Sequence, residues 1–167
     1  MRGLLKIAPI IISATLLLCA AEVRTPLRPM YTADIAITSD GEFLLANKGT
    51  SDVTLLDKDG KRLHYWSTEE PPTGIIVVED KAYVTSSYDR GHLTCIDLND
   101  NSIKYSTQTG MGACAPVVSP DRSKIYVLNR YKGTVSEVDA TTGAVQREVK
   151  VLREPCDAAL SPDGRYL

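Results

Sequence analysis

The sequence predicts an all-β protein, a β-propeller built from four-stranded antiparallel blades. Three features that recur along the 167 residues predict it: a tight turn, a short strand that ends on a small polar residue, and a strand that closes on aspartate. The closing residues Asp57, Asp97 and Asp139 are 40 and 42 residues apart. Four short strands in a period of about 40 residues are typical of one propeller blade.

Each predicted blade opens with a strand that leads into a turn. The turns read Thr-Ser-Asp-Gly at 38–41, Ser-Pro-Asp-Arg at 119–122 and Ser-Pro-Asp-Gly at 161–164, whereas the second unit has Glu-Asp-Lys at 79–81. Proline presets the backbone of a tight turn, aspartate bonds back to local amides, and glycine accepts a positive φ. These segments therefore predict hairpin turns between the first and second strands.

The remaining strands follow in a fixed order. Aromatic and β-branched residues favour strand over helix in runs this short. The second strands are predicted at 44–47, 83–86 and 126–129, the third at 53–57, 93–97 and 135–139, and the fourth at 62–67, 102–107 and 144–149.

These elements divide the chain into three predicted blades, at 33–70, 71–111 and 112–152, with the start of a fourth at 153–167. Within that last range, residues 157–167 are expected to supply a first strand and the beginning of a second. A closed propeller needs about four to eight blades. We therefore expect the sequence to be the N-terminal fragment of a longer protein.

Residues 1–21 have the pattern of a signal peptide. Arg2 and Lys6 precede an uncharged run over 7–18, and small residues follow up to Ala21. The run is shorter than the roughly 20 apolar residues of a membrane-spanning helix. Cleavage after Ala21 predicts an exported protein, periplasmic or associated with the cell surface, without a transmembrane span in its mature form. A lipid anchor on Cys19 is the alternative, and residues 22–32 are predicted to be a lead-in.

Charge and cysteine content exclude several classes of protein. Removing Arg2 and Lys6 with the signal peptide moves the formal net charge from −2 to −4, which argues against a nucleic-acid partner. The mature chain keeps three cysteines, an odd number that predicts no complete disulfide framework. They form no Cys-x-x-Cys-His motif for c-type haem and no zinc-ribbon spacing.

The motifs carry a family resemblance. Tyr-Val-Thr-Ser at 83–86, Ser-Pro-Asp-Gly at 161–164 and Val-x-x-Val-Asp at 135–139 resemble the YVTN-type propeller repeats of bacterial exported proteins, over residues 33–167. The resemblance implies a full-length propeller of about seven blades. Members include surface-layer proteins, cofactor-associated propellers and relatives of lactonases, so it implies an architecture and no single chemistry.

One group of candidate binding residues falls at the predicted start of the innermost strands. Asp34, Cys114 and Cys156 each lie five residues before the serine of a turn, and the second unit has Thr73 or Gly74 there. At the channel mouth they could form a metal, redox or ligand site. Alternatively the two cysteines are small half-buried apolar residues, because soft-metal sites usually need three or four ligands. We expect the two cysteines to stay unbonded, since a disulfide needs Cα atoms within about 7 Å.

A second candidate group lies in the loops between the second and third strands. Arg90, Arg130 and Tyr131 are its principal members, and an Arg–Tyr pair can hold a carboxylate or stack on a ring. Ordinary solvated loop charge is the alternative interpretation. The same loops also contain Lys48, Tyr88, Asp89, His92 and Lys132.

The sequence shows no catalytic motif of the Gly-x-Ser-x-Gly or His-Glu-x-x-His kind and no phosphate-binding glycine loop. No catalytic residue, metal ligand set or cofactor is therefore assigned. The leading hypothesis is a non-enzymatic scaffold that binds a protein, a glycan or a small ligand at its loops or channel mouth. The alternatives are a lactonase-like or cofactor-dependent redox enzyme, and a propeller that associates with an electron-transfer protein.

Overall fold

A computed structural model describes residues 31–167 of the chain. The predicted signal peptide, the candidate lipid-anchor residue Cys19 and most of the predicted lead-in lie outside these described residues. Within them the strands form three separate four-stranded antiparallel sheets, each made of four consecutive strands. This confirms the predicted all-β fold of four-stranded units.

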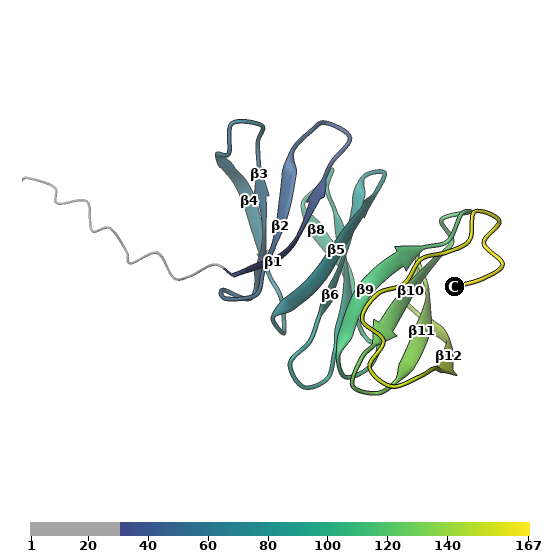
Figure 1. Ribbon diagram of the computed structural model, residues 1–167. Helices are drawn as coiled ribbons and strands as arrows, with labels where there is room; N and C mark the ends of the chain where they lie inside the picture. Colours follow the sequence, from purple (N-terminus) through teal and green to yellow (C-terminus); the bar gives the residue numbers. More distant parts are fainter. Residues whose placement is uncertain (1–30) are drawn as a thin grey trace, which may run out of the picture.

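The three sheets are stacked side by side like the ribs of a fan (Figure 1). The first sheet contains β1 (Thr32–Ile37), β2 (Phe43–Asn47), β3 (Asp52–Leu56) and β4 (Arg62–Ser67). The second contains β5 (Pro72–Val78), β6 (Lys81–Ser86), β7 (His92–Asp97) and β8 (Ser102–Gln108). The third contains β9 (Ala113–Val118), β10 (Lys124–Asn129), β11 (Thr134–Asp139) and β12 (Val145–Lys150). Because β1 lies beside β5 and β5 beside β9, the first strands form the inner edge of the fan.

The turn chemistry expected of the aspartates is present. Asp57 accepts hydrogen bonds from the amides of Asp59 and Lys61, at 3.0 and 2.8 Å. In the Ser119–Arg122 turn, the hydroxyl of Ser119 donates to Asp121 at 2.6 Å and accepts the amide of Lys124 at 3.0 Å. These bonds satisfy the free amides of the turns and set the register of the hairpins.

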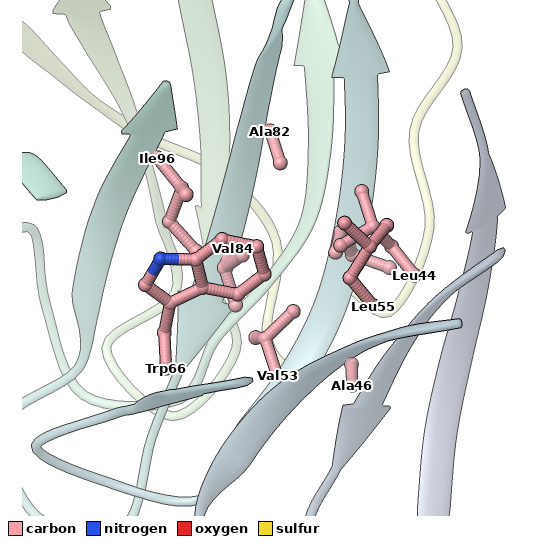
Figure 2. Close-up of a cluster of buried hydrophobic side chains, with 9 residues drawn as sticks. Leu44, Ala46, Val53, Leu55, Trp66, Ala82, Val84 and Ile96 are labelled. Carbon is pink, nitrogen blue, oxygen red and sulfur yellow. The ribbon is translucent and has the colours of Figure 1, made fainter. Parts of the chain in front are cut away.

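An apolar core fills the space between the first and second sheets. Trp66 of β4 is only 5% exposed, and its ring lies against Val84 and Ile96 of the second sheet (Figure 2). Its indole N–H donates to the carbonyl of Asn101, at 2.9 Å. Successive side chains of a strand point to opposite faces of its sheet, so every second side chain of a strand can face this core.

A second core joins the second and third sheets. Tyr83 and Tyr105 of the second sheet both donate their hydroxyls to the carbonyl of Ala140, at 3.2 and 3.1 Å. Burial raises the pKa of Tyr83 to about 12, and the pKa of Tyr105 is also raised by its burial. Both hydroxyls therefore stay protonated and keep donating across the sheet interface at any ordinary pH.

The last segment differs from the expectation for a fourth unit. The turn at 161–164 forms, with the amide of Gly164 bonded to the carbonyl of Ser161 at 2.8 Å. However, residues 153–167 contain no strand, so the first strand expected within 157–167 is not formed in this structure.

Residues 31–167 contain no helix long and apolar enough to cross a bilayer.

Candidate functional site

The candidate residues gather at one end of the sheets, where the second strand of each unit passes to the third. This end carries the loops at 48–51, 87–91 and 130–133, together with the beginnings of β1, β5 and β9. We call it the loop face. The opposite end carries the hairpin turns at 57–60, 97–101 and 139–143.

The position shared by Asp34, Thr73 and Cys114 links neighbouring units. The carboxylate of Asp34 accepts the amide of Ile75 at 3.0 Å, and the hydroxyl of Thr73 donates to the carbonyl of Ala113 at 2.6 Å. The thiol of Cys114 lies 4.0 Å from the carbonyl of Pro155. Each side chain thus reaches backbone about one repeat further along the chain. These contacts give the side chains at this position a structural role between neighbouring units.

A hollow of about 280 Å³ lies on the loop face and brings several candidates together. Residues from all three four-stranded units line it, with Lys48 in the loop after β2 as the contribution of the first, and so does the segment that follows β12. Asp34 and Arg90 do not line it, although both were candidates. The lining residues are Lys48, Thr73, Ser87, Gly112, Ala113, Cys114, Arg130, Tyr131 and Cys156.

The floor of this hollow is a network of backbone hydrogen bonds. Gly112 donates its amide to the hydroxyl of Ser87 at 2.9 Å, and its carbonyl accepts the amide of Arg130 at 3.0 Å. A Cβ on Gly112 would lie 2.6 Å from the amide nitrogen of Tyr131. Only glycine therefore allows this close approach. Sequence reasoning missed Ser87 and Gly112, because neither carries a group that suggests chemistry by its type.

Arg130 and Tyr131 form a ledge at the rim of the hollow. The guanidinium carbon of Arg130 lies 5.9 Å from the centre of the Tyr131 ring, a distance at which cation and ring attract. Both side chains reach solvent, Arg130 with 46% of its side chain exposed. A second hollow of about 320 Å³ shares this ledge and adds Lys132, Lys150, Val151, Arg153 and Glu154 to the lining. The ledge is therefore shared by two adjoining concave surfaces.

The three cysteines differ in exposure. Cys156 is exposed, Cys114 is half-buried and Cys95 is buried, and all three are free thiols. Burial raises the pKa of Cys114, although the charge of Arg130 opposes that rise. Burial also raises the pKa of Cys95. The thiolate form, which reacts with electrophiles, is therefore disfavoured at both positions.

These differences predict the order in which iodoacetamide labels the native protein. Cys156 is expected to react first, Cys114 more slowly, and Cys95 only after unfolding, because access of the reagent to the thiol decreases in that order. Peptide mapping by mass spectrometry over a time course measures this order. Labelling of Cys95 as fast as Cys156, or a Cys114–Cys156 disulfide in the protein before reduction, would contradict it.

The loop that carries Arg90 is fastened by Glu70, which sequence reasoning did not single out. The carboxylate of Glu70 accepts the amides of Asp89 and Arg90 at 2.8 Å and that of Gly91 at 2.7 Å. Burial acts to raise the pKa of Glu70, but these backbone bonds outweigh it and lower the pKa to about 2. Arg90 is thereby held on the loop face, outside the hollow.

Replacing Glu70 by glutamine is expected to reduce the free energy of unfolding by about 1–3 kcal/mol, because three backbone amides of the loop lose a charged acceptor. A depressed pKa stabilises the fold above the ordinary value of 4.5, and the benefit is lost as pH falls toward about 2. The difference between wild type and E70Q should therefore shrink over that window. Urea unfolding at several pH values measures it.

The neighbouring residue gives a matched control. Glu69 is 61% exposed, and its one ion-pair contact within residues 31–167 is with the Nε2 atom of His92, at 3.4 Å. E69Q is expected to change stability by less than about 1 kcal/mol. Equal losses of stability for E69Q and E70Q would show that the hydrogen bonds between Glu70 and the loop amides do not stabilise the loop.

No group of three or more His, Cys, Asp or Glu side chains suited to a metal ion occurs in residues 31–167. Of the two histidines, His64 packs against Trp66 with ring centres 4.6 Å apart. His92 is buried between Glu69 and Glu70, with its ring nitrogens 3.4 Å from one oxygen of each. The two histidines lie at separate places and share no site.

No protein-family model matches the chain, and no curated protein matches it either. No family match therefore confirms the resemblance to YVTN-type repeats that the motifs indicate.

Structural comparison defines the fold class. Hydrazine synthase from Kuenenia stuttgartiensis matches 88% of this chain and 43% of its own at a TM-score of 0.75 and 19% identity. Virginiamycin B lyase from Staphylococcus aureus matches 80% and 46% at a TM-score of 0.68 and 12% identity. The β-propeller domain of Cps50 (Swd1) from Myceliophteria thermophila matches 80% and 46% at a TM-score of 0.62 and 17% identity. The described chain is therefore part of a β-propeller, as predicted.

The chain spans less than half the length of each of these three solved structures. At identities below 20% the likeness concerns the fold alone.

Proposed function

We propose that this protein is an exported, non-enzymatic β-propeller scaffold that binds a ligand on its loop face. The observation that carries the proposal is the hollow beside the Arg130–Tyr131 ledge, to which the strands or loops of all three units contribute residues. Concave sites between repeats are where such folds bind ligands, and loops held on a rigid scaffold are common binding elements.

Preorganisation of the ledge supports a binding role. The amides of Tyr131 and Lys132 donate to the carbonyl of Met111 at 3.2 and 3.3 Å, and the amide of Gly133 donates to that of Asn129 at 2.8 Å. A loop fixed in this way loses little conformational freedom when a ligand binds. The arrangement therefore suits recognition.

Export to the periplasm or cell surface is part of the proposal and rests on the pattern of residues 1–21 together with the YVTN-type motifs. The motifs are those of bacterial exported proteins, and the leader has the charge and length of a cleaved signal peptide. Fractionation of cells that express the protein, followed by N-terminal sequencing of the mature form, tests this part. An uncleaved cytoplasmic product would contradict it.

The binding role is tested by screening the protein against glycan arrays, peptides and small metabolites, and comparing wild type with a double variant R130A/Y131A. A ligand that loses at least about tenfold in affinity, about 1.4 kcal/mol, supports the loop-face site. A ligand that binds both proteins equally well would place binding elsewhere and contradict the proposal.

An enzyme is the second candidate, and its support is that two of the three structural relatives are named as enzymes, a hydrazine synthase and a lyase. Lactonase-like or cofactor-dependent redox chemistry falls in this group, whereas association with an electron-transfer protein is a separate alternative. Turnover of any substrate by the pure protein would favour this candidate over the scaffold.

A further inference from the structure

We propose that the ligand of the Arg130–Tyr131 ledge is a carboxylate-bearing sugar, a uronic acid unit of an acidic glycan. This inference rests on the proposed binding function and names the chemistry that the same site recognises.

The charge of the hollow is the first argument. Its lining contains two cationic side chains, Lys48 and Arg130, and no Asp or Glu, although the whole chain has a formal net charge of −2. The adjoining hollow adds three further cations, Lys132, Lys150 and Arg153, against one acid, Glu154. A concave surface of one sign concentrates ligands of the opposite sign.

The second argument is that Arg130 remains available to a ligand. Its only ion pair among the described residues is with Glu154, at 3.8 Å, and that carboxylate is largely exposed. By contrast Lys132 is held by Glu148 at 2.6 Å. A guanidinium offers several N–H donors in a planar fork that matches a carboxylate, so a weakly held Arg130 can accept one in bidentate fashion.

The third argument favours a sugar over a bare anion. Tyr131 is 64% exposed beside the hollow, with the guanidinium of Arg130 over its ring. An exposed tyrosine ring offers a flat apolar body with a polar tip. The apolar C–H face of a sugar ring packs on such a surface while its carboxylate reaches Arg130.

Size and continuity point to one unit of a longer chain. A volume of about 280 Å³ falls just below the range of roughly 300–1,000 Å³ for drug-sized pockets. The adjoining hollow of about 320 Å³ shares Arg130 and Tyr131, so neighbouring sugars have a continuous surface on which to lie. The ledge is thus the contact common to both sugars.

The experiment is calorimetric titration of the protein with tetragalacturonate, its fully methyl-esterified form, and neutral maltotetraose. The ester keeps the sugar and removes the charge. We expect tetragalacturonate to bind, and the ester and maltotetraose to bind at least about tenfold more weakly. Binding should weaken as salt is added, because exposed charges are screened.

Variants locate the contact. R130A and Y131A are each expected to weaken tetragalacturonate binding at least about tenfold, and K48A to weaken it less. Lys61 is exposed on the opposite end, so K61A removes the same charge away from the site and should stay within about twofold of wild type. Equal losses for K61A and R130A would indicate nonspecific attraction and overturn the inference.

The outcomes also separate this inference from the proposed function. If the ester or maltotetraose binds as well as the acid and R130A/Y131A abolishes that binding, the loop-face site stands and carboxylate recognition is wrong. If none of the three saccharides binds, the inference is overturned, while the wider ligand screen decides the proposed function separately.

Discussion

Replacing Trp66 by alanine is expected to lower the free energy of unfolding by about 3–5 kcal/mol, the cost of removing a large buried aromatic side chain. The indole ring fills the space between the first and second sheets against Val84 and Ile96, and its N–H bonds to the carbonyl of Asn101 across the interface. The substitution leaves a cavity at the place where two blades meet. Chemical unfolding followed by circular dichroism measures the loss.

Two further variants test whether burial of the Trp66 ring is the cause of the expected loss of stability. W66F keeps an aromatic ring and removes the N–H donor, so its loss should be smaller than that of W66A. Tyr65 is the adjacent residue on β4 but is 57% exposed, and Y65A should cost less than about 1 kcal/mol. If W66A and Y65A destabilise equally, the ring of Trp66 does not hold the two sheets together.

Replacing Gly91 by alanine is expected to cost about 3–5 kcal/mol, among the larger values seen for single substitutions. Gly91 has a φ of 80°, which residues with a Cβ adopt at a cost of about 1–2 kcal/mol. In addition its Cβ would lie 1.9 Å from the carbonyl oxygen of Gly110, so backbone must move. Thermal or urea unfolding of G91A measures the total loss of stability from the two effects.

Gly60 separates the two contributions. Its φ of 81° is nearly the same, but no atom lies within 4 Å of a Cβ built on it. G60A should therefore show only the conformational cost, and the difference between G91A and G60A reports the collision with Gly110. Similar losses in both variants would mean that the loop at 87–91 and the strand end at 108–110 are not packed as described.

The strand pattern was predictable from the sequence because it depends on local chemistry. The turn aspartates bond to amides two to four residues away, as Asp57 and Asp121 do. Asn47 and Asn129, which end the second strands, each bond to side chains five and seven residues on, so they also act locally. Interactions of this range recur with the repeat and can be recognised from spacing alone.

The candidate site was only partly predictable because its contacts cross between units. The sequence places Asp34 among the candidate binding residues at the channel mouth. In the structure its carboxylate accepts a hydrogen bond from the amide of Ile75, 41 residues away. Arg90 and Arg130 occupy equivalent loops, yet only Arg130 lines the hollow. Which loop residue faces a hollow depends on how neighbouring blades are packed, and the repeat pattern does not encode this packing.

Glu70 illustrates the same limit for stability. Its neighbour Glu69 has the same chemistry in the sequence, and only the fold shows that Glu70 alone meets three amides of the 87–91 loop. The three hydrogen bonds depend on the backbone geometry of a loop some 20 residues away in the sequence, so composition and spacing do not predict them.

The most direct test of the loop-face site is to map bound tetragalacturonate on the 18.2 kDa chain by amide chemical shifts in NMR. We predict that the largest shifts fall on Gly112, Arg130 and Tyr131, whose backbone forms the floor and ledge of the hollow. Largest shifts on the opposite end, in the turns at 57–60 and 139–143, would contradict a binding site on the loop face.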